Sequence, residues 1–254
     1  MSERKPSASL KHREYYDRAA DAVPQFTALN YGFSTDPENS VIAANEPDFY
    51  CLRLYEHTVR DTPLAGRDVL EVSCGRGGGA YFVSRTFAPL RYLGVDLSEE
   101  NIRLARARAT HAALSFAIGN AEQLALPDTS FDVVINIEAS HLYDDRTRFF
   151  AEAARVLRPG GYFCYTDGCW ADDDCSEDLL DAGFALLERL EITSNVLHAL
   201  RKDSARRTML FDGMKNHELR EEYKHWGGVV GYRAYNRFEA GQTRYFSHRL
   251  RKPL

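Results

Sequence analysis

The sequence predicts an α/β fold in which a mainly parallel sheet lies between helices. Three observations support this prediction: short apolar runs recur from residue 66 onward, helical patterns separate them, and glycine or proline marks several of the junctions. The runs are apolar on both faces, which is typical of parallel strands covered by helices. Ligands bind such sheets beyond the carboxyl ends of the strands, so we expect the functional residues there.

Seven apolar runs are the candidate strands. They lie at 67–73, 91–97, 114–120, 131–138, 161–167, 184–192 and 243–252. Helical patterns lie between them at 80–86, 98–110 and 146–157, and the last one ends where proline and glycine follow. We divide the single expected domain into a helical, aromatic-rich cap (1–60), a ligand-binding core (61–168) and a remainder (169–254) with a helical lid insert at about 195–226.

Composition and charge argue against several classes of partner. The 254 residues carry a net charge of −5, so no general field favours nucleic acid. The longest apolar runs are too short to span a bilayer, and the N-terminus lacks the apolar segment of a secretory signal. Five cysteines without a CxxC pair fit reduced thiols. We therefore expect a cytoplasmic protein with neither a nucleic-acid partner nor a membrane span.

The segment from Glu71 to Gly79 has the composition of a ligand-binding loop. Gly75 and Gly77 allow the chain to turn and a ligand to approach the backbone. Their spacing departs from the G-x-G-x-x-G of dinucleotide sites, and Glu71 would repel a pyrophosphate but attract an ammonium group. Asp96 follows Gly75 by 21 residues, the spacing at which an acid accepts both ribose hydroxyls. The expected ligand is a nucleoside with a cationic tail, which is S-adenosylmethionine.

Four motifs occur in the order found in the class I S-adenosylmethionine-dependent methyltransferases, which they resemble: LEVSCGRGGG, LGVDLS, GNAEQLALPDTSFDVVI and RVLRPGG. The segments HREYYDRAADAVPQFTALNYGF and INIEASHLY are similar to a subgroup, the phthiotriol and phenolphthiotriol dimycocerosate methyltransferases and the fatty-acid O-methyltransferases. The resemblance implies a Rossmann-like seven-stranded sheet, mostly parallel with an antiparallel last strand, and a helical cap and lid.

The resemblance also implies which residues bind the methyl donor. Residues 71–77 would hold the methionine end, Asp96 the ribose, and Leu97, Asn120 and Ala121 the adenine. Asn120 stands where many relatives have aspartate, so we expect weaker charge assistance to the adenine amino group. The full set of expected donor-binding residues is Tyr16, Glu71, Ser73, Gly75, Gly77, Asp96, Leu97, Asn120, Ala121, Glu122 and Ile137.

A catalytic base is expected in the segment after the fourth run. An alcohol proton does not leave unaided at pH 7, and the ordinary pKa of His141 suits a base that works near neutrality. The alternative for His141 is a hydrogen bond that fixes the loop. Glu138 is the second candidate: it could orient His141, contact the substrate or accept hydrogen bonds from backbone N–H groups.

Aromatic residues beyond the fourth run are expected to wall an apolar acceptor pocket or to pack the lid. They are Tyr143, Trp170, Phe211, Tyr223 and Trp226. His217 and His225 in the lid insert are expected to be solvated. The acidic cluster of Asp167 and the three aspartates at 172–174 raises the question of Mg²⁺, but consecutive aspartates point in different directions, and we expect no metal.

Together these features predict an O-methyltransferase that transfers a methyl group in line to a hydroxyl of a hydrophobic lipid or polyketide-like metabolite. C- or N-methylation of a similar small molecule stays open, as does a protein of this fold that binds the donor but performs a cyclisation or only binds. A nicotinamide-dependent oxidoreductase is disfavoured by Glu71. The expected partner is an apolar small molecule, and a homodimer is the oligomer that we consider.

Overall fold

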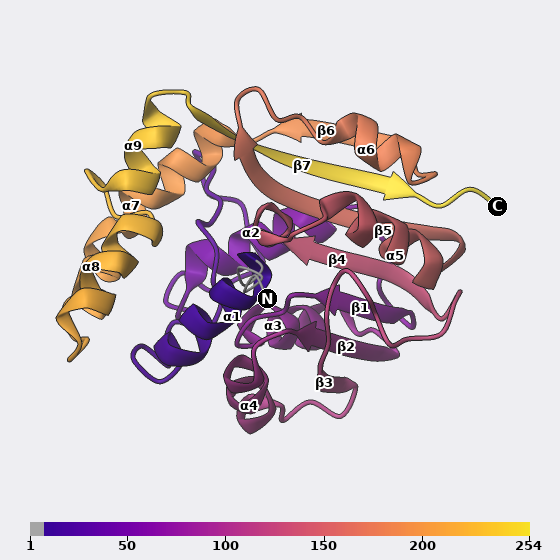
Figure 1. The fold of residues 1–254 in the computed structure, drawn as a ribbon, viewed down its shortest axis with the longest axis horizontal. Coiled ribbons are helices and arrows are strands. Elements are labelled where there is room, and N and C mark those ends of the chain that lie inside the picture. Colours follow the sequence, from indigo (N-terminus) through magenta and orange to yellow (C-terminus); the bar gives the residue numbers. More distant parts are fainter. Residues whose placement is uncertain (1–7) are drawn as a thin grey trace, which may run out of the picture.

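A seven-stranded sheet of order β3-β2-β1-β4-β5-β7-β6 forms the centre of the molecule, in a computed structural model that describes residues 8–254 (Figure 1). The strands are β1 (Asp68–Val72), β2 (Arg91–Asp96), β3 (Leu114–Ile118), β4 (Phe131–Ile137), β5 (Leu157–Trp170), β6 (Ala185–Glu191) and β7 (Thr243–Arg251). Neighbours from β3 to β5 are parallel, and β7 is antiparallel to β5 and β6. The predicted sheet is confirmed.

Helices cover both faces of this sheet. They are α2 (Phe49–Val59), α3 (Gly78–Phe87) and α4 (Glu99–Arg108) on one face and α5 (Arg146–Val156) and α6 (Ser176–Asp181) on the other. β1 is buried at all five positions because it lies between β2 and β4 and beneath both helical layers. The short helix α6 was not predicted.

The remaining helices lie beyond the carboxyl ends of the parallel strands (Figure 1). They are α1 (Ala8–Ala19), α7 (Thr193–Asp212), α8 (His217–Trp226) and α9 (Arg233–Glu239). The lid insert therefore extends past residue 226, where the sequence pattern placed its end. Between residues 8 and 254 no helix is both long and apolar enough to cross a membrane.

The cap differs from the helical segment that the sequence predicted. Residues 20–48 form turns and loops between α1 and α2. Two fully buried arginines from other parts of the chain hydrogen-bond the carbonyl groups of this segment. Arg76 donates to Val23 (2.7 Å) and Phe26 (3.0 Å), and Arg207 of α7 donates to Asn30 (2.9 Å). In this segment these side-chain bonds satisfy carbonyl groups that a helix would satisfy with backbone N–H groups. The density of aromatic residues therefore did not indicate a helix over residues 20–48.

β5 begins earlier than predicted. Leu157 already pairs with Phe131 of β4, and the sequence Arg158-Pro159-Gly160-Gly161, expected to separate helix and strand, lies inside the strand. The register shifts between Phe131 and Val133, so the proline and the glycines occupy an irregular start of the ladder.

Candidate active site

The loop between β1 and α3 is bent by three residues with left-handed backbone, Ser73 (φ 60°), Gly75 (φ 54°) and Gly77 (φ 77°). A Cβ at Gly77 would lie 2.6 Å from the ring of Phe116, so only glycine fits there. The loop is tied to β2 because the N–H of Cys74 donates to the carbonyl of Val95 (2.9 Å). Its backbone is thus held at the carboxyl end of the sheet, where a ligand can reach it.

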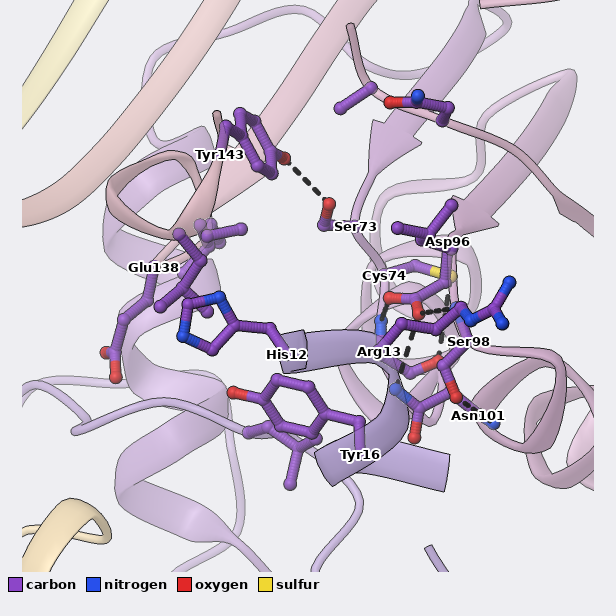
Figure 2. A pocket seen from close by; sticks show the side chains of 18 of the residues that line it. His12, Arg13, Tyr16, Ser73, Cys74, Asp96, Ser98, Asn101, Glu138 and Tyr143 are labelled. Atoms are coloured by element: carbon purple, nitrogen blue, oxygen red, sulfur yellow. Dashed lines mark hydrogen bonds between the residues drawn. The ribbon is translucent and has the colours of Figure 1, made fainter. Parts of the chain in front are cut away.

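A cavity with about 790 Å³ of empty space, its open mouth included, lies at the ends of β1 to β4 (Figure 2). It is lined by His12, Arg13, Tyr16, Leu29, Tyr55, Ser73, Cys74, Gly75, Asp96, Leu97, Ser98, Asn101, Asn120, Ala121, Glu122, Ile137, Glu138, Ala139, Leu142 and Tyr143. Of the residues predicted to bind the donor, all but Glu71 and Gly77 line it. The residues predicted to bind the donor thus make up nine of the twenty residues that line the cavity.

Glu71 does not face the cavity. Its two carboxylate oxygens accept hydrogen bonds from the hydroxyl groups of Tyr55 and Tyr92, each at 2.7 Å. Burial raises the pKa of Glu71 to about 7, although both hydroxyl groups oppose the shift. Glu71 itself is not among the residues that line the cavity, so its contact with a ligand stays a prediction. Tyr55 lines the cavity and links it to the carboxylate.

Asp96 lies at the carboxyl end of β2 and lines the cavity. One oxygen accepts from the N–H of Gly75 (2.8 Å), and the other accepts from the N–H of Ser98 (2.9 Å) and the amide of Asn101 (3.3 Å). Burial raises the pKa of Asp96, and these hydrogen bonds oppose it. The carboxylate thus fixes the glycine loop while it borders the cavity. At the end of β3, Asn120 accepts from the N–H of Glu122 (2.9 Å), so its amide oxygen also stabilises a turn.

Helix α1 closes one side of the cavity. His12, Arg13 and Tyr16 share one face of this helix, and Figure 2 shows His12 and Tyr16 between Glu138 on one side and Asp96 on the other. The carboxylate of Asp17 accepts from the hydroxyl of Ser98, which tethers the helix next to Asp96. Only Tyr16 was predicted. His12 and Arg13 precede Tyr16 by four and three residues, a spacing that places all three on one face of a helix.

His141 is held by Asp167 of β5. The Nδ1 atom of His141 lies 2.7 Å from one oxygen of Asp167, and its backbone N–H donates to the other (3.2 Å). Asp167 is 4% exposed, whereas the side chain of His141 is 39% exposed. Desolvation lowers the pKa of His141, but the charge and hydrogen bond of Asp167 outweigh it, so this pKa lies above its ordinary value. His141 does not line the cavity, but its neighbours Ala139 and Leu142 do.

Glu138 has a different role from the orienting one that the sequence offered. Glu138 lines the cavity, and its carboxylate accepts from the backbone N–H of Tyr31 (2.8 Å) and the hydroxyl of Tyr245 (2.6 Å). Its backbone is left-handed (φ 50°), and burial raises its pKa to about 7. The backbone hydrogen bond was one of the three roles considered. The partner that orients His141 is Asp167 instead.

The aromatic residues expected around an acceptor fall into different places. Tyr143 lines the cavity and its hydroxyl bonds Ser73 (2.6 Å). Tyr223 is buried outside the cavity, where it stacks on Tyr15 and accepts from Arg76 (3.0 Å). Trp170 and Trp226 lie on the outer surface, 49% and 47% exposed. Neither tryptophan walls the cavity, which corrects that expectation.

Two of the four aspartates in the acidic cluster form ion pairs with arginines, and a third bonds a histidine. Asp173 pairs with Arg146 (2.9 Å) and Asp174 with Arg189 (2.8 Å), while Asp167 bonds His141. Across residues 8–254 there is no group of three or more His, Cys, Asp or Glu side chains that could hold a metal ion.

Comparison with known proteins identifies the family. Residues 70–165 match the model described as "Methyltransferase domain". The chain is 37% identical over 229 residues to the fatty-acid O-methyltransferase of Mycolicibacterium smegmatis, with 89% of this chain and 83% of that protein covered. It is 37% identical over 226 residues to the phthiotriol/phenolphthiotriol dimycocerosates methyltransferase of Mycobacterium tuberculosis, covering 85% and 82%. The chain belongs to the S-adenosylmethionine-dependent methyltransferases.

Solved structures agree with this methyltransferase in fold. The [4+2]-cyclase SpnF shares 22% identity at a TM-score of 0.74, covering 97% of this chain and 96% of that one. The geranyl diphosphate C-methyltransferase of Streptomyces coelicolor A3(2), in complex with Mg²⁺, geranyl diphosphate and S-adenosyl-L-homocysteine, shares 16% at a TM-score of 0.70, covering 96% and 97%. The methyl donor of the protein described here is S-adenosylmethionine, and the demethylated product is S-adenosylhomocysteine.

Proposed function

We propose that this methyltransferase transfers the methyl group to a hydroxyl of a hydrophobic lipid or polyketide-like molecule. The observation that carries the proposal is the pair of His141 and Asp167, which lies beside a cavity suited to the donor. The names of the two relatives, one an O-methyltransferase of fatty acids and one acting on phthiotriol dimycocerosates, support a lipid-like acceptor.

The cavity fits a ligand that combines a nucleoside with cationic groups. Asp96 and Glu138 lie on opposite sides of the cavity, and Leu97 and Ala121 are apolar residues of its wall. Two acids would repel a pyrophosphate but attract a sulfonium and an ammonium group. In this assignment Asp96 binds the ribose, Leu97 and Ala121 border the adenine, and Ser73 and Tyr55 lie toward the methionine end.

His141 acts as the general base in the proposed reaction. S-adenosylmethionine supplies an electrophilic methyl group, and its sulfur keeps the electron pair of the broken S–CH₃ bond. The Nε2 atom of His141 takes the hydroxyl proton while the acceptor oxygen forms the new bond to carbon. Asp167 holds the proton on Nδ1 and stabilises the imidazolium that forms. The partial exposure of His141 leaves Nε2 accessible to an acceptor.

Mass spectrometry with a deuterated methyl donor tests the proposal. The purified enzyme is incubated with long-chain hydroxy lipids and fatty acids, and products are fragmented to locate the label. We expect one labelled methyl group per product, bound to oxygen. A label bound to carbon or nitrogen would contradict O-transfer, as would donor binding without transfer to any of these acceptors.

C-methylation is the second candidate, and Glu138 is the observation that favours it. Glu138 lines the cavity and its carboxylate lies next to the hydroxyl of Tyr245, so it could stabilise a carbocation or take a proton from carbon. The same fragmentation experiment separates the two reactions, because a methyl group on carbon survives cleavage of an ether or ester.

A further inference from the structure

The two tryptophans of the chain lie together on the outer surface and share an arginine. The guanidinium of Arg237 lies 4.8 Å from the ring centre of Trp170 and 5.8 Å from that of Trp226. Arg233 lies 5.2 Å from Trp226 on the same side. Trp170 ends β5, Trp226 ends α8, and both arginines come from α9. We call these four residues the Trp–Arg patch.

The patch is locally positive although the chain as a whole is negative. Neither Arg233 nor Arg237 forms an ion pair with any residue in the range 8–254, and each lies against an indole ring instead. The nearby carboxylate of Glu239 is paired with Arg201 (3.4 Å). Of the three aspartates that follow Trp170, Asp173 and Asp174 are likewise paired with arginines, so only exposed Asp172 offsets the charge of Arg233 and Arg237 there. Two guanidinium groups are therefore left to attract an external anion.

The patch is separated from the catalytic groups by one aromatic layer. Phe238 of α9 packs on Tyr31 and Tyr245, with ring centres 5.2 and 6.1 Å apart, and both tyrosines hydrogen-bond Glu138 in the cavity wall. β5 itself connects Trp170 to Asp167, three residues and therefore roughly 10 Å away. A surface bound at the patch would lie next to the acceptor side of the site.

We propose that the Trp–Arg patch docks the enzyme on an anionic lipid bilayer, from which the acceptor is taken. The inference rests on the proposed function in one respect, that the acceptor is lipid-like. Arginines near an anionic leaflet bind its phosphate groups, and tryptophan side chains favour the headgroup level because they are apolar with one polar N–H. Half-exposed indoles beside unpaired guanidinium groups match that chemistry. One patch of this size gives reversible binding.

Intrinsic fluorescence tests the proposal directly, because the chain has no tryptophan outside the patch. The full chain is titrated with phosphatidylglycerol vesicles and with phosphatidylcholine vesicles, without donor or acceptor. We expect a blue shift of the emission and quenching by brominated lipid with phosphatidylglycerol, and far less with phosphatidylcholine. No shift with phosphatidylglycerol would overturn the proposal, as would equal shifts with both lipids.

Two double variants distinguish binding through the Trp–Arg patch from binding through the overall charge of the protein. In Arg233→Gln/Arg237→Gln we expect partitioning to phosphatidylglycerol to weaken roughly 10- to 30-fold. The matched control is Arg67→Gln/Arg85→Gln, which removes the same charge at two half-exposed arginines elsewhere, each with one ion pair near 4 Å (3.8 and 3.7 Å). Equal weakening in both double variants would contradict a specific patch. Because the vesicles contain no acceptor, a failure here leaves methyl transfer in the labelling experiment unaffected.

Discussion

His141 is fixed through both its ring and its backbone by one buried carboxylate, so its replacement should affect chemistry and leave donor binding intact. For His141→Ala we predict a kcat lower by about 10²- to 10⁴-fold, the usual contribution of a general base. The dissociation constant of S-adenosylhomocysteine, measured by calorimetry, should stay within about twofold of wild type. Unchanged turnover would remove His141 from the mechanism.

Asp167→Asn tests the charge that acts on this base. His141 must be neutral to accept a proton, so activity is lost as the pH falls through its raised pKa. Without the carboxylate this pKa drops, and the acidic limb of the kcat/KM profile should move to lower pH. The plateau should fall as well, because the imidazolium loses its counter-charge. A limb that stays in place would show that another group titrates.

Tyr55 and Tyr92 provide a matched pair around Glu71. Each phenylalanine variant removes one hydrogen bond from the same buried carboxylate, so both should lower the free energy of unfolding by about 1–3 kcal/mol. Only Tyr55 lines the cavity. We therefore predict weaker donor binding in Tyr55→Phe and little change in Tyr92→Phe, measured by calorimetry beside urea denaturation. Equal donor affinities in both variants would contradict a role for Tyr55 at the cavity.

The same residues show how far sequence reasoning reached. Ser73, Gly75 and Asp96 were predictable because they adjoin strand ends, where the fold itself brings side chains together. Glu71 was expected at the ligand but does not line the cavity, since a tyrosine from α2 and another from β2 bond its oxygens and no motif reveals those bonds. Asp167 was not predicted as the partner of His141, because His141 follows β4 whereas Asp167 lies 26 residues later on β5.

At the scale of elements, α1 forms one wall of the cavity. Asp17 tethers this helix to Ser98, which follows Asp96. In Asp17→Ala we predict a dissociation rate of S-adenosylhomocysteine about fivefold higher, as expected for the loss of one hydrogen bond. The control is Asp21→Ala, which removes an exposed ion pair from the same region to Arg103 (2.6 Å) and should leave the rate unchanged. Stopped-flow fluorescence measures both, and equal rates in the two variants would exclude the tether.

Strands and helices of the core were predicted to within a few residues because their apolar periodicity reflects burial directly. The cap was harder, since residues 20–48 have no periodicity and are shaped by hydrogen bonds from Arg76 and Arg207. The end of the lid was also missed. Six residues, three of them glycine, separate α8 from α9, and the seven residues of α9 are too few for a strong helical pattern.

At the scale of the whole molecule, a standard sheet positions four strand ends around one cavity, and residues of the cap, among them Tyr16 and Leu29, close it. Fully buried Arg207 connects the cap and the lid, because it donates to Asn30 in the cap, to Gly227 after α8 and to Asp203 within α7. Arg207 therefore connects the lid to the cap segment that contains Tyr31, and the backbone N–H of Tyr31 donates to Glu138 in the cavity wall. We expect the loops of the cap and the lid to determine which acceptor fits, and the strand ends of the sheet to determine the donor.

The central claim is that the cavity bordered by Asp96 binds the methyl donor, and calorimetry tests it most directly. Titration of the wild-type chain with S-adenosylhomocysteine should show one site per chain. Asp96→Asn should weaken binding about 10- to 100-fold, the cost of losing a hydrogen-bonding charge, with a thermal melt to confirm folding. No heat with the wild-type chain, or an unchanged affinity in folded Asp96→Asn, would contradict the account.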